Sequence, residues 1–297
     1  RNFTCQSLMD ANLHTDVVVL GGGSAGIAAA VAVARKGLQV VLIERNAYPG
    51  GKATAAEVGT VCGLYKFHNK ENAEYLVNGF AKEFADSLQS VSNSKALHNS
   101  DGLHYLPYNI ESFKEIALGL LQKHRVTAYF NSVLKTVQTE SDKIVSVSVI
   151  AEGNPINIQL KSIIDCSGDS IISRSAGLPL IETDHYQAAA QVFTMQGVDE
   201  TNEARLGMII MKALRTAIEN EELANFYDRV YIVPGSLKNK TVSFKVGIPL
   251  AVTYAPGNLQ ELKTVAQSFV ENLSQFLTTR VDIFKNASIK NIAPEVG

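Results

Sequence analysis

The sequence contains no long hydrophobic run and no marked excess of charge. A membrane-spanning helix needs about 18 or more consecutive apolar residues, and runs such as 17–20 and 40–43 are far shorter. The 27 lysines and arginines nearly balance the 29 aspartates and glutamates, and they are spread along the chain. Because nucleic-acid binding usually requires clustered positive charge, we expect a soluble protein with neither a membrane nor a nucleic acid as its partner.

Cysteine is scarce, and its spacing excludes two common uses of the residue. Cys5, Cys62 and Cys166 are odd in number and far apart, and none belongs to a CxxC pair. We therefore predict no metal site and no redox-active disulfide, and a reducing, cytoplasmic location. The chain begins at Arg1 without a charged and then apolar leader. We expect that a segment precedes it, in which any targeting signal would lie.

The first part of the chain has the pattern of a β-α-β unit. Residues 16–20 form a short β-branched run, typical of a strand buried on both faces of a parallel sheet. An alanine-rich stretch, 24–36, follows a run of glycines and ends before Gly37, as expected of a helix. Residues 39–44 repeat the strand pattern. Right-handed crossover would make the two strands parallel neighbours.

The rest of the first half extends this sheet. We predict helices over 72–89 and 109–124, a third parallel strand over 126–130, and a buried strand over 162–165 that returns to the sheet. Between the last two, turn residues separate three strand-like runs, which predict a β-meander over about 133–160.

The length of 297 residues exceeds that of a typical domain of about 100–200 residues. Beyond about residue 180 the pattern changes to strands over 188–197 and 241–254 and helices over 203–219 and 259–277. The predicted fold class is therefore α/β, a doubly wound parallel sheet with a β-meander crossover and a second α+β domain. We place the nucleotide domain at 1–179, with a helical insertion at about 65–105, and the substrate or cap domain at 180–297.

A glycine motif joins the first predicted strand to the first predicted helix. Gly21, Gly23 and Gly26 satisfy GxGxxG, which is weak evidence alone but strong between a strand and a helix. Gly21 permits the tight turn, Gly23 lets a diphosphate approach the backbone, and Gly26 lets the helix pack on the strand. We therefore predict a dinucleotide-binding domain of the Rossmann type.

The residues around this motif favour the same function. Backbone amides of Ser24 and Ala25 open the helix, where unpaired N–H groups and the helix dipole favour a diphosphate. Glu44 ends the second strand, where a carboxylate can accept hydrogen bonds from an adenosine ribose. The alternative is a structural glycine turn beside a surface glutamate. The motif itself does not separate NAD from FAD.

Four segments resemble one family. They are 16–26, Glu44-Arg45, 49–54 with the sequence Pro-Gly-Gly-Lys-Ala-Thr, and 163–169 with the sequence Ile-Ile-Asp-Cys-Ser-Gly-Asp. In this order they resemble the FAD-dependent oxidoreductases with a glutathione-reductase-like FAD domain, and most closely the bacterial branch of that family. The resemblance covers nearly the whole chain and implies that the cofactor is FAD.

The resemblance also implies roles for individual residues. The second glycine segment would follow the diphosphate and ribityl chain of FAD, unless it is only a Pro-Gly-Gly turn. Val133 would contact the adenine through its backbone. Cys166-Ser167 stands where the family usually has Ala-Thr, and Ser167 can keep the hydroxyl. The residues expected to bind the cofactor are Gly21, Gly23, Ser24, Ala25, Gly26, Glu44, Arg45, Gly50, Gly51, Lys52, Ala53, Thr54, Val133, Ser167, Gly168 and Asp169.

The sequence departs from the family at its end. The family normally continues past 292–297 with an Asn-Leu-x-x-x-Gly-Arg strand and a helix that points at the flavin pyrimidine, and neither is present. Either the chain is a truncated product or its flavin binding is incomplete, and of these two interpretations we favour truncation.

In a flavoenzyme the flavin performs the redox step, so the protein needs no catalytic triad. Cys62 follows the second glycine segment and is a candidate for a thiol that faces the flavin, although a structural cysteine is the alternative. We therefore predict an FAD-dependent oxidoreductase that uses a small-molecule substrate and an electron acceptor, and a homo-oligomer is compatible with the sequence. A nicotinamide-dependent reductase is one alternative, disfavoured by the single GxGxxG and the lack of CxxxxC. A non-catalytic FAD-binding module is another.

Overall fold

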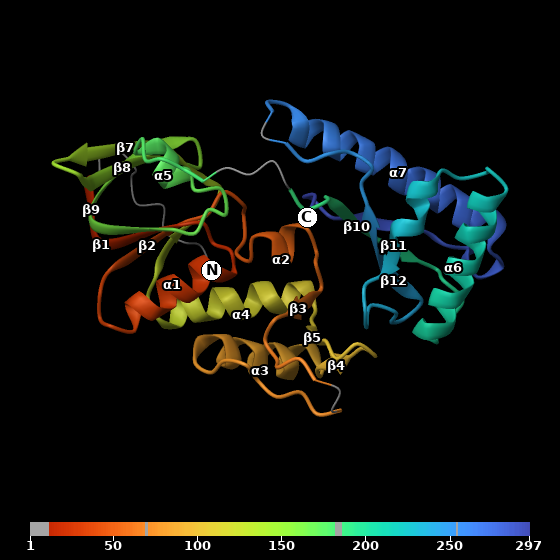
Figure 1. Ribbon diagram of the computed structural model, residues 1–297. Coiled ribbons are helices and arrows are strands. Elements are labelled where there is room, and N and C mark those ends of the chain that lie inside the picture. Colours follow the sequence, from red (N-terminus) through yellow and green to blue (C-terminus); the bar gives the residue numbers. More distant parts are fainter. Residues whose placement is uncertain (1–11, 69–70, 182–185, 254) are drawn as a thin grey trace. The chain divides into compact units, whose positions relative to one another are not determined.

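The computed structural model describes residues 12–68, 71–181, 186–253 and 255–297, and these divide into two units (Figure 1). Unit 1 combines 12–54, 64–94 and 108–181, apart from those gaps, and unit 2 combines 55–63, 95–107 and 186–297. No helix among these residues is both long enough and apolar enough to cross a bilayer.

Unit 1 contains one six-stranded sheet and the helices that pack on it. In chain order its elements are β1 (Asn12–Leu20), α1 (Ser24–Ala34), β2 (Val40–Ile43), α3 (Phe80–Ser92), α4 (Ile110–Lys123), β6 (Thr127–Tyr129), β7 (Ser132–Glu140), β8 (Lys143–Ala151), β9 (Asn154–Asp165) and α5 (Ile171–Ser175). A short helix, α2 (Lys52–Ala55), ends at the boundary between the units.

The strands of this sheet lie in the order β6-β2-β1-β9-β8-β7. The first four are parallel, and β7, β8 and β9 form antiparallel pairs. Strand β1 lies in the interior of the sheet, where its apolar valine side chains are shielded from water. Val18 and Val19 are completely buried. All four residues of β2 are buried as well. These strands show the continuous hydrophobic pattern of a sheet covered on both faces.

Strand β9 combines two predicted strands and corrects that part of the prediction. We predicted a third meander strand that ends near residue 160 and a separate return strand at 162–165. Instead, one strand pairs with β8 through 154–159 and with β1 in parallel from Asn157 to Asp165. Lys161 lies at the apparent break in the apolar pattern, and it remains in the strand because its side chain is exposed and pairs with Asp16.

Helices α1, α4 and α3 form successive layers on the sheet (Figure 1). Helix α1 contacts β1, β2 and β9, while α4 packs on α1 and α3 packs on α4. The side chain of Asn109 accepts a hydrogen bond from the Ser112 amide and caps α4, in agreement with the predicted start. Helix α3 begins later than predicted, after Gly79 with φ +78°. Before this helix, Tyr65 and Tyr75 form an isolated antiparallel β-bridge.

Unit 2 contains two antiparallel sheets and two long helices. Its elements are β3 (Thr60–Cys62), β4 (Leu97–His98), β5 (His104–Pro107), β10 (Ala190–Gln196), α6 (Glu203–Glu219), the 3-10 helix η1 (Asn225–Arg229), β11 (Val230–Ile232), β12 (Thr241–Gly247), α7 (Asn258–Arg280), the 3-10 helix η2 (Asp282–Phe284) and β13 (Ser288–Ile292). The strand orders are β3-β5-β4 and β11-β12-β10-β13.

The core of unit 2 lies between the larger sheet and its helices. Phe193 and Phe244 are buried on neighbouring strands, and their rings are 5.3 Å apart. They pack with apolar residues of α6 and α7 such as Leu206 and Leu273. Helix α6 has the predicted bounds, and α7 covers the predicted 259–277. The predicted fold class, a doubly wound parallel sheet with a β-meander and additional α+β structure, is confirmed.

Candidate functional site

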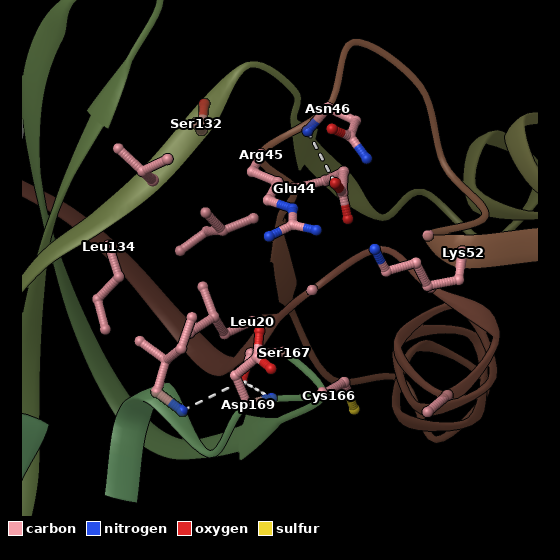
Figure 2. A pocket seen from close by; sticks show the side chains of 18 of the residues that line it. Leu20, Glu44, Arg45, Asn46, Lys52, Ser132, Leu134, Cys166, Ser167 and Asp169 are labelled. Atoms are coloured by element: carbon pink, nitrogen blue, oxygen red, sulfur yellow. Dashed lines mark hydrogen bonds between the residues drawn. The ribbon is translucent and has the colours of Figure 1, made fainter. Parts of the chain in front are cut away.

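A cavity of about 390 Å³ opens in unit 1 at the carboxyl ends of β1, β2 and β9 (Figure 2). This is the edge of a doubly wound sheet at which ligands bind. The residues that line it are Leu20, Gly21, Gly23, Ser24, Ala25, Ile43, Glu44, Arg45, Asn46, Gly51, Lys52, Ser132, Val133, Leu134, Cys166, Ser167, Gly168, Asp169 and Ile171. Twelve of the sixteen residues expected to bind the cofactor are among them.

The first turn of the site depends on two glycines for its shape. Gly21 has φ +99°, and a Cβ there would collide with the backbone oxygen of Cys166, the residue that follows β9. A Cβ at Gly26 would collide with the backbone oxygen of Gly21. Gly26 does not line the cavity, so its role is to let α1 approach the strands. Gly23 differs from both, because the nearest described atom to its Cβ position is the Gly51 Cα at 3.8 Å.

The N-terminus of α1 faces the cavity with its backbone. Gly23 is the N-cap and has no side chain to accept a hydrogen bond. The helical hydrogen bonds start with the Ile27 amide, which donates to the Gly23 carbonyl at 2.9 Å. Helix geometry therefore leaves the amides of Ser24, Ala25 and Gly26 without an intrahelical acceptor. These N–H groups and the positive end of the helix dipole favour an anion such as a diphosphate.

Glu44 is a buried carboxylate at the end of β2, and its side chain is held from both sides. The residue is 4% exposed. Oε2 accepts a hydrogen bond from the Gly22 amide at 2.5 Å. Oε1 accepts one from the Asn46 amide at 2.7 Å, which Figure 2 shows as a dashed line. A carboxylate offers about four lone-pair sites, so roughly two can still accept the hydroxyls of a ribose. A Cβ at Gly22 would lie 3.0 Å from the Glu44 side chain, a tight contact that would require this side chain to shift.

The second glycine segment contributes only part of its length to the cavity wall. The Gly50 amide donates to the Gly22 carbonyl at 2.7 Å and fixes this segment against the first turn. Gly51 and Lys52 line the cavity. Gly50, Ala53 and Thr54 do not line this cavity. The Ala53 carbonyl accepts a hydrogen bond from Tyr108, and the Thr54 hydroxyl donates to the Pro49 carbonyl. Their expected place along the diphosphate and ribityl chain of FAD stays a prediction.

Cationic side chains and an apolar wall complete the site. Figure 2 shows Arg45 and Lys52 at the cavity, where their positive charges favour an anionic ligand. Val133 is 50% exposed and Ile171 is 37% exposed, although both are large apolar residues. Together with Leu134 they form a surface suited to a flat apolar group such as adenine. The prediction named Val133 alone.

Sequence reasoning missed several lining residues. Asn46 and Ser132 lie close to Glu44, since the Ser132 amide donates to the Glu44 carbonyl. Ile171 follows the 163–169 segment by two positions. These residues could have been predicted from their positions in the sequence, because they lie within a few residues of strand ends that were predicted to meet at this edge.

Cys166 lies on the cavity wall as a thiol. Burial, together with the nearby negative charge of Asp165, raises the pKa of Cys166 above its ordinary value. Cys62 does not line the cavity; it is exposed on β3 and belongs to unit 2. Cys5 lies outside the described residues.

The donor set fits FAD. Helix amides and cations suit a diphosphate, the Glu44 carboxylate suits a ribose, and an apolar wall suits adenine. Fold and site together define a dinucleotide-binding protein of the doubly wound class. A sequence model of the FAD dependent oxidoreductase family matches residues 16–297, and the chain belongs to this family.

Several known proteins are similar to this chain. Sarcosine oxidase subunit alpha from Rhizobium meliloti is 29% identical over 111 residues, which are 37% of this chain and 10% of that subunit. The solved structure of a geranylgeranyl bacteriochlorophyll reductase-like protein from Thermoplasma acidophilum has a TM-score of 0.52 and 16% identity. The p-nitrophenol 4-monooxygenase PnpA from Pseudomonas putida has a TM-score of 0.55 and 12% identity.

The chain covers only part of each relative. It is matched over 96% and 94% of its own length by the two structures and covers 66% of each of them. At these identities the structures show a shared fold. The family match confirms the predicted class of enzyme, an FAD-dependent oxidoreductase, and the predicted cofactor, FAD.

Proposed function

We propose that the cavity of unit 1 holds the ADP half of FAD, and that the chain transfers electrons between a small-molecule substrate and an electron acceptor through the bound flavin. The observation that carries this proposal is that one cavity contains both the open N-terminus of α1 and the buried Glu44 carboxylate. These groups match the diphosphate and the ribose of the same ligand.

Each part of the wall has a separate task in this proposal. The amides of Ser24 and Ala25 donate to the diphosphate, and Arg45 and Lys52 balance its charge. Glu44 accepts hydrogen bonds from the ribose hydroxyls. The Gly22 and Asn46 amides hold the Glu44 carboxylate in place, so little conformational entropy is lost when FAD binds.

The bound FAD supplies the redox chemistry, and the chain supplies binding and orientation. The glutathione-reductase-like form of the FAD domain belongs to the proposal, supported by Glu44-Arg45 and the second glycine segment. Cys62 remains a candidate for a thiol near the flavin. Cytoplasmic location, the electron acceptor and a homo-oligomer also remain predictions.

The proposal is tested by the absorbance spectrum of the purified full-length protein. Bound cofactor is then released with acid and identified by chromatography. A flavin spectrum with FAD in the extract supports the proposal and leads to a search for electron donors. A colourless protein that takes up no added FAD refutes it, and parallel titrations with NAD and NADP then test the nicotinamide alternative. FAD bound without turnover of any donor would favour the non-catalytic module.

A further inference from the structure

Asp165, the last residue of β9, accepts three hydrogen bonds from the turn that follows it. Oδ1 accepts one from the Ser167 amide at 3.0 Å and one from the Ser167 hydroxyl at 2.6 Å. Oδ2 accepts one from the Ile172 amide at 2.8 Å. The side chain therefore ties the end of a sheet strand to the first turn of α5. Asp165 itself is not part of the cavity wall.

The Ser167 hydroxyl extends this arrangement to the wall. The Ser167 hydroxyl donates its proton to Asp165, so its lone pairs can accept other hydrogen bonds. It accepts one from the Asp169 amide at 3.3 Å and one from the Ile171 amide at 3.2 Å. Ile171 lines the cavity. Ser167 and Asp169 line it as well (Figure 2). The turn between them includes Gly168 with φ +82°. A carboxylate behind the wall thus sets the direction of the hydrogen bonds within it.

This network determines where the apolar part of the wall stands. The Ile171 amide itself donates to the Ser167 hydroxyl, and the Ile171 residue is 37% exposed at the cavity. Hydrogen bonds to a charged acceptor are stronger than those between neutral groups. A neutral residue in place of Asp165 would therefore loosen the wall before it loosened the strand, whose ladder with β1 is made by the backbone.

We infer that Asp165 is a positioning residue for FAD, which acts through the Ser167 hydroxyl to hold the 166–171 wall in its binding shape. The inference rests on the proposed function of the cavity. In Asp165→Asn one carboxylate oxygen becomes an NH₂ group, so that a donor faces either the Ser167 groups or the Ile172 amide. Ser167→Ala removes the hydroxyl, whereas Ser167→Thr retains one.

The test is the Kd of FAD for the apoprotein, measured by fluorescence titration well below the Tm of each variant. We expect Kd to rise about tenfold or more in Asp165→Asn and in Ser167→Ala, which is about the loss of one charge-assisted hydrogen bond. Ser167→Thr should stay near the wild-type value. The double variant should bind about as well as either single variant, because groups that act in series are not additive.

Asp16→Asn is the matched control. Asp16 lies on β1, and its carboxylate likewise accepts a backbone amide, that of Gln39 at 2.8 Å. It is not part of the cavity wall. The Asp16→Asn substitution should lower the Tm of the apoprotein without changing the Kd of FAD.

Two results would overturn the inference while leaving the proposed function intact. If the wild type binds FAD and both Asp165→Asn and Ser167→Ala bind it equally tightly, Asp165 only stabilises the fold. If Asp165→Asn does not fold, the Ser167 pair decides alone, and equal Kd values for Ser167→Ala and Ser167→Thr refute the positioning role. A wild-type protein that binds no FAD refutes the proposed function itself, and this inference with it.

Discussion

Replacing Gly23 by alanine should separate FAD binding from folding. Gly23 has φ −72° and ψ −176°, which alanine adopts without strain. The added Cβ would have the Gly51 Cα at 3.8 Å as its nearest described neighbour, an ordinary contact distance. The protein itself therefore has room for the methyl group. If the diphosphate of FAD approaches the backbone at Gly23, as the proposed function requires, the methyl group would occupy space that the diphosphate needs.

The expected magnitudes follow from this geometry. At an N-cap, alanine is less favourable than glycine by about 0.5–1 kcal/mol. Restriction of the unfolded chain returns about 0.4–1 kcal/mol. The free energy of unfolding of the apoprotein should thus change by less than about 1 kcal/mol. Loss of one amide hydrogen bond to the diphosphate costs about 1.5–3 kcal/mol, and this raises the Kd of FAD about 10- to 150-fold.

The assay combines urea unfolding of the apoprotein with a fluorescence titration of FAD. Gly119→Ala is the matched control, because Gly119 lies within α4 and its Cβ position has no described atom within 4 Å. That variant should be slightly more stable, by about 1 kcal/mol, with unchanged FAD affinity. If Gly23→Ala binds FAD as tightly as the wild type, the diphosphate does not lie against Gly23 and the proposed orientation is wrong.

Three further predictions concern charges and thiols. Glu44→Gln should lower the unfolding free energy of the apoprotein by about 1–3 kcal/mol, because an NH₂ group would face a backbone amide; unchanged stability in urea would contradict the bonds seen here. Cys166 should be alkylated by iodoacetamide more slowly than the exposed Cys62 in peptide mapping, and faster as pH rises, since burial raises its pKa; equal rates near neutral pH would count against this. The hydrogen bonds from Arg35 lower the pKa of Glu83 below its ordinary value of 4.5. These bonds therefore stabilise the fold fully above pH 4.5, and the stabilisation is lost as the pH falls through the lower pKa of the folded state. Glu83→Gln should weaken that acid dependence in urea unfolding, at a cost of about 1 kcal/mol or less at neutral pH.

The elements of this fold that sequence could predict are those with a strong local pattern. The valines of β1 and the alanines of α1 specify their structure within a few residues, and α6 was predicted with its observed bounds. The errors arose where tertiary contacts decide. Strand β9 continues through Lys161 because β1 supplies a partner along its whole length. Helix α3 begins only after Gly79, although the sequence pattern favoured a helix from residue 72.

The site residues that could be predicted are those whose role follows from their position in a sequence motif. Gly21, Gly23 and Glu44 belong to a motif whose spacing follows from a strand, a turn, a helix and a second strand. The second glycine segment could not be resolved in this way. Whether Gly51 or Thr54 faces the cavity depends on how the Gly50 amide docks on the Gly22 carbonyl, a contact between loops.

The same reasoning explains why Asp165 escaped notice although it lies within a segment that carries the family resemblance. Its role is visible only when the directions of its three hydrogen bonds are known, because a carboxylate at a strand end could equally point to solvent. Sequence specifies which residues reach the ligand edge of the sheet. The hydrogen bonds behind that edge, which hold Ser167 and Ile171 in place, have to be seen in the structure.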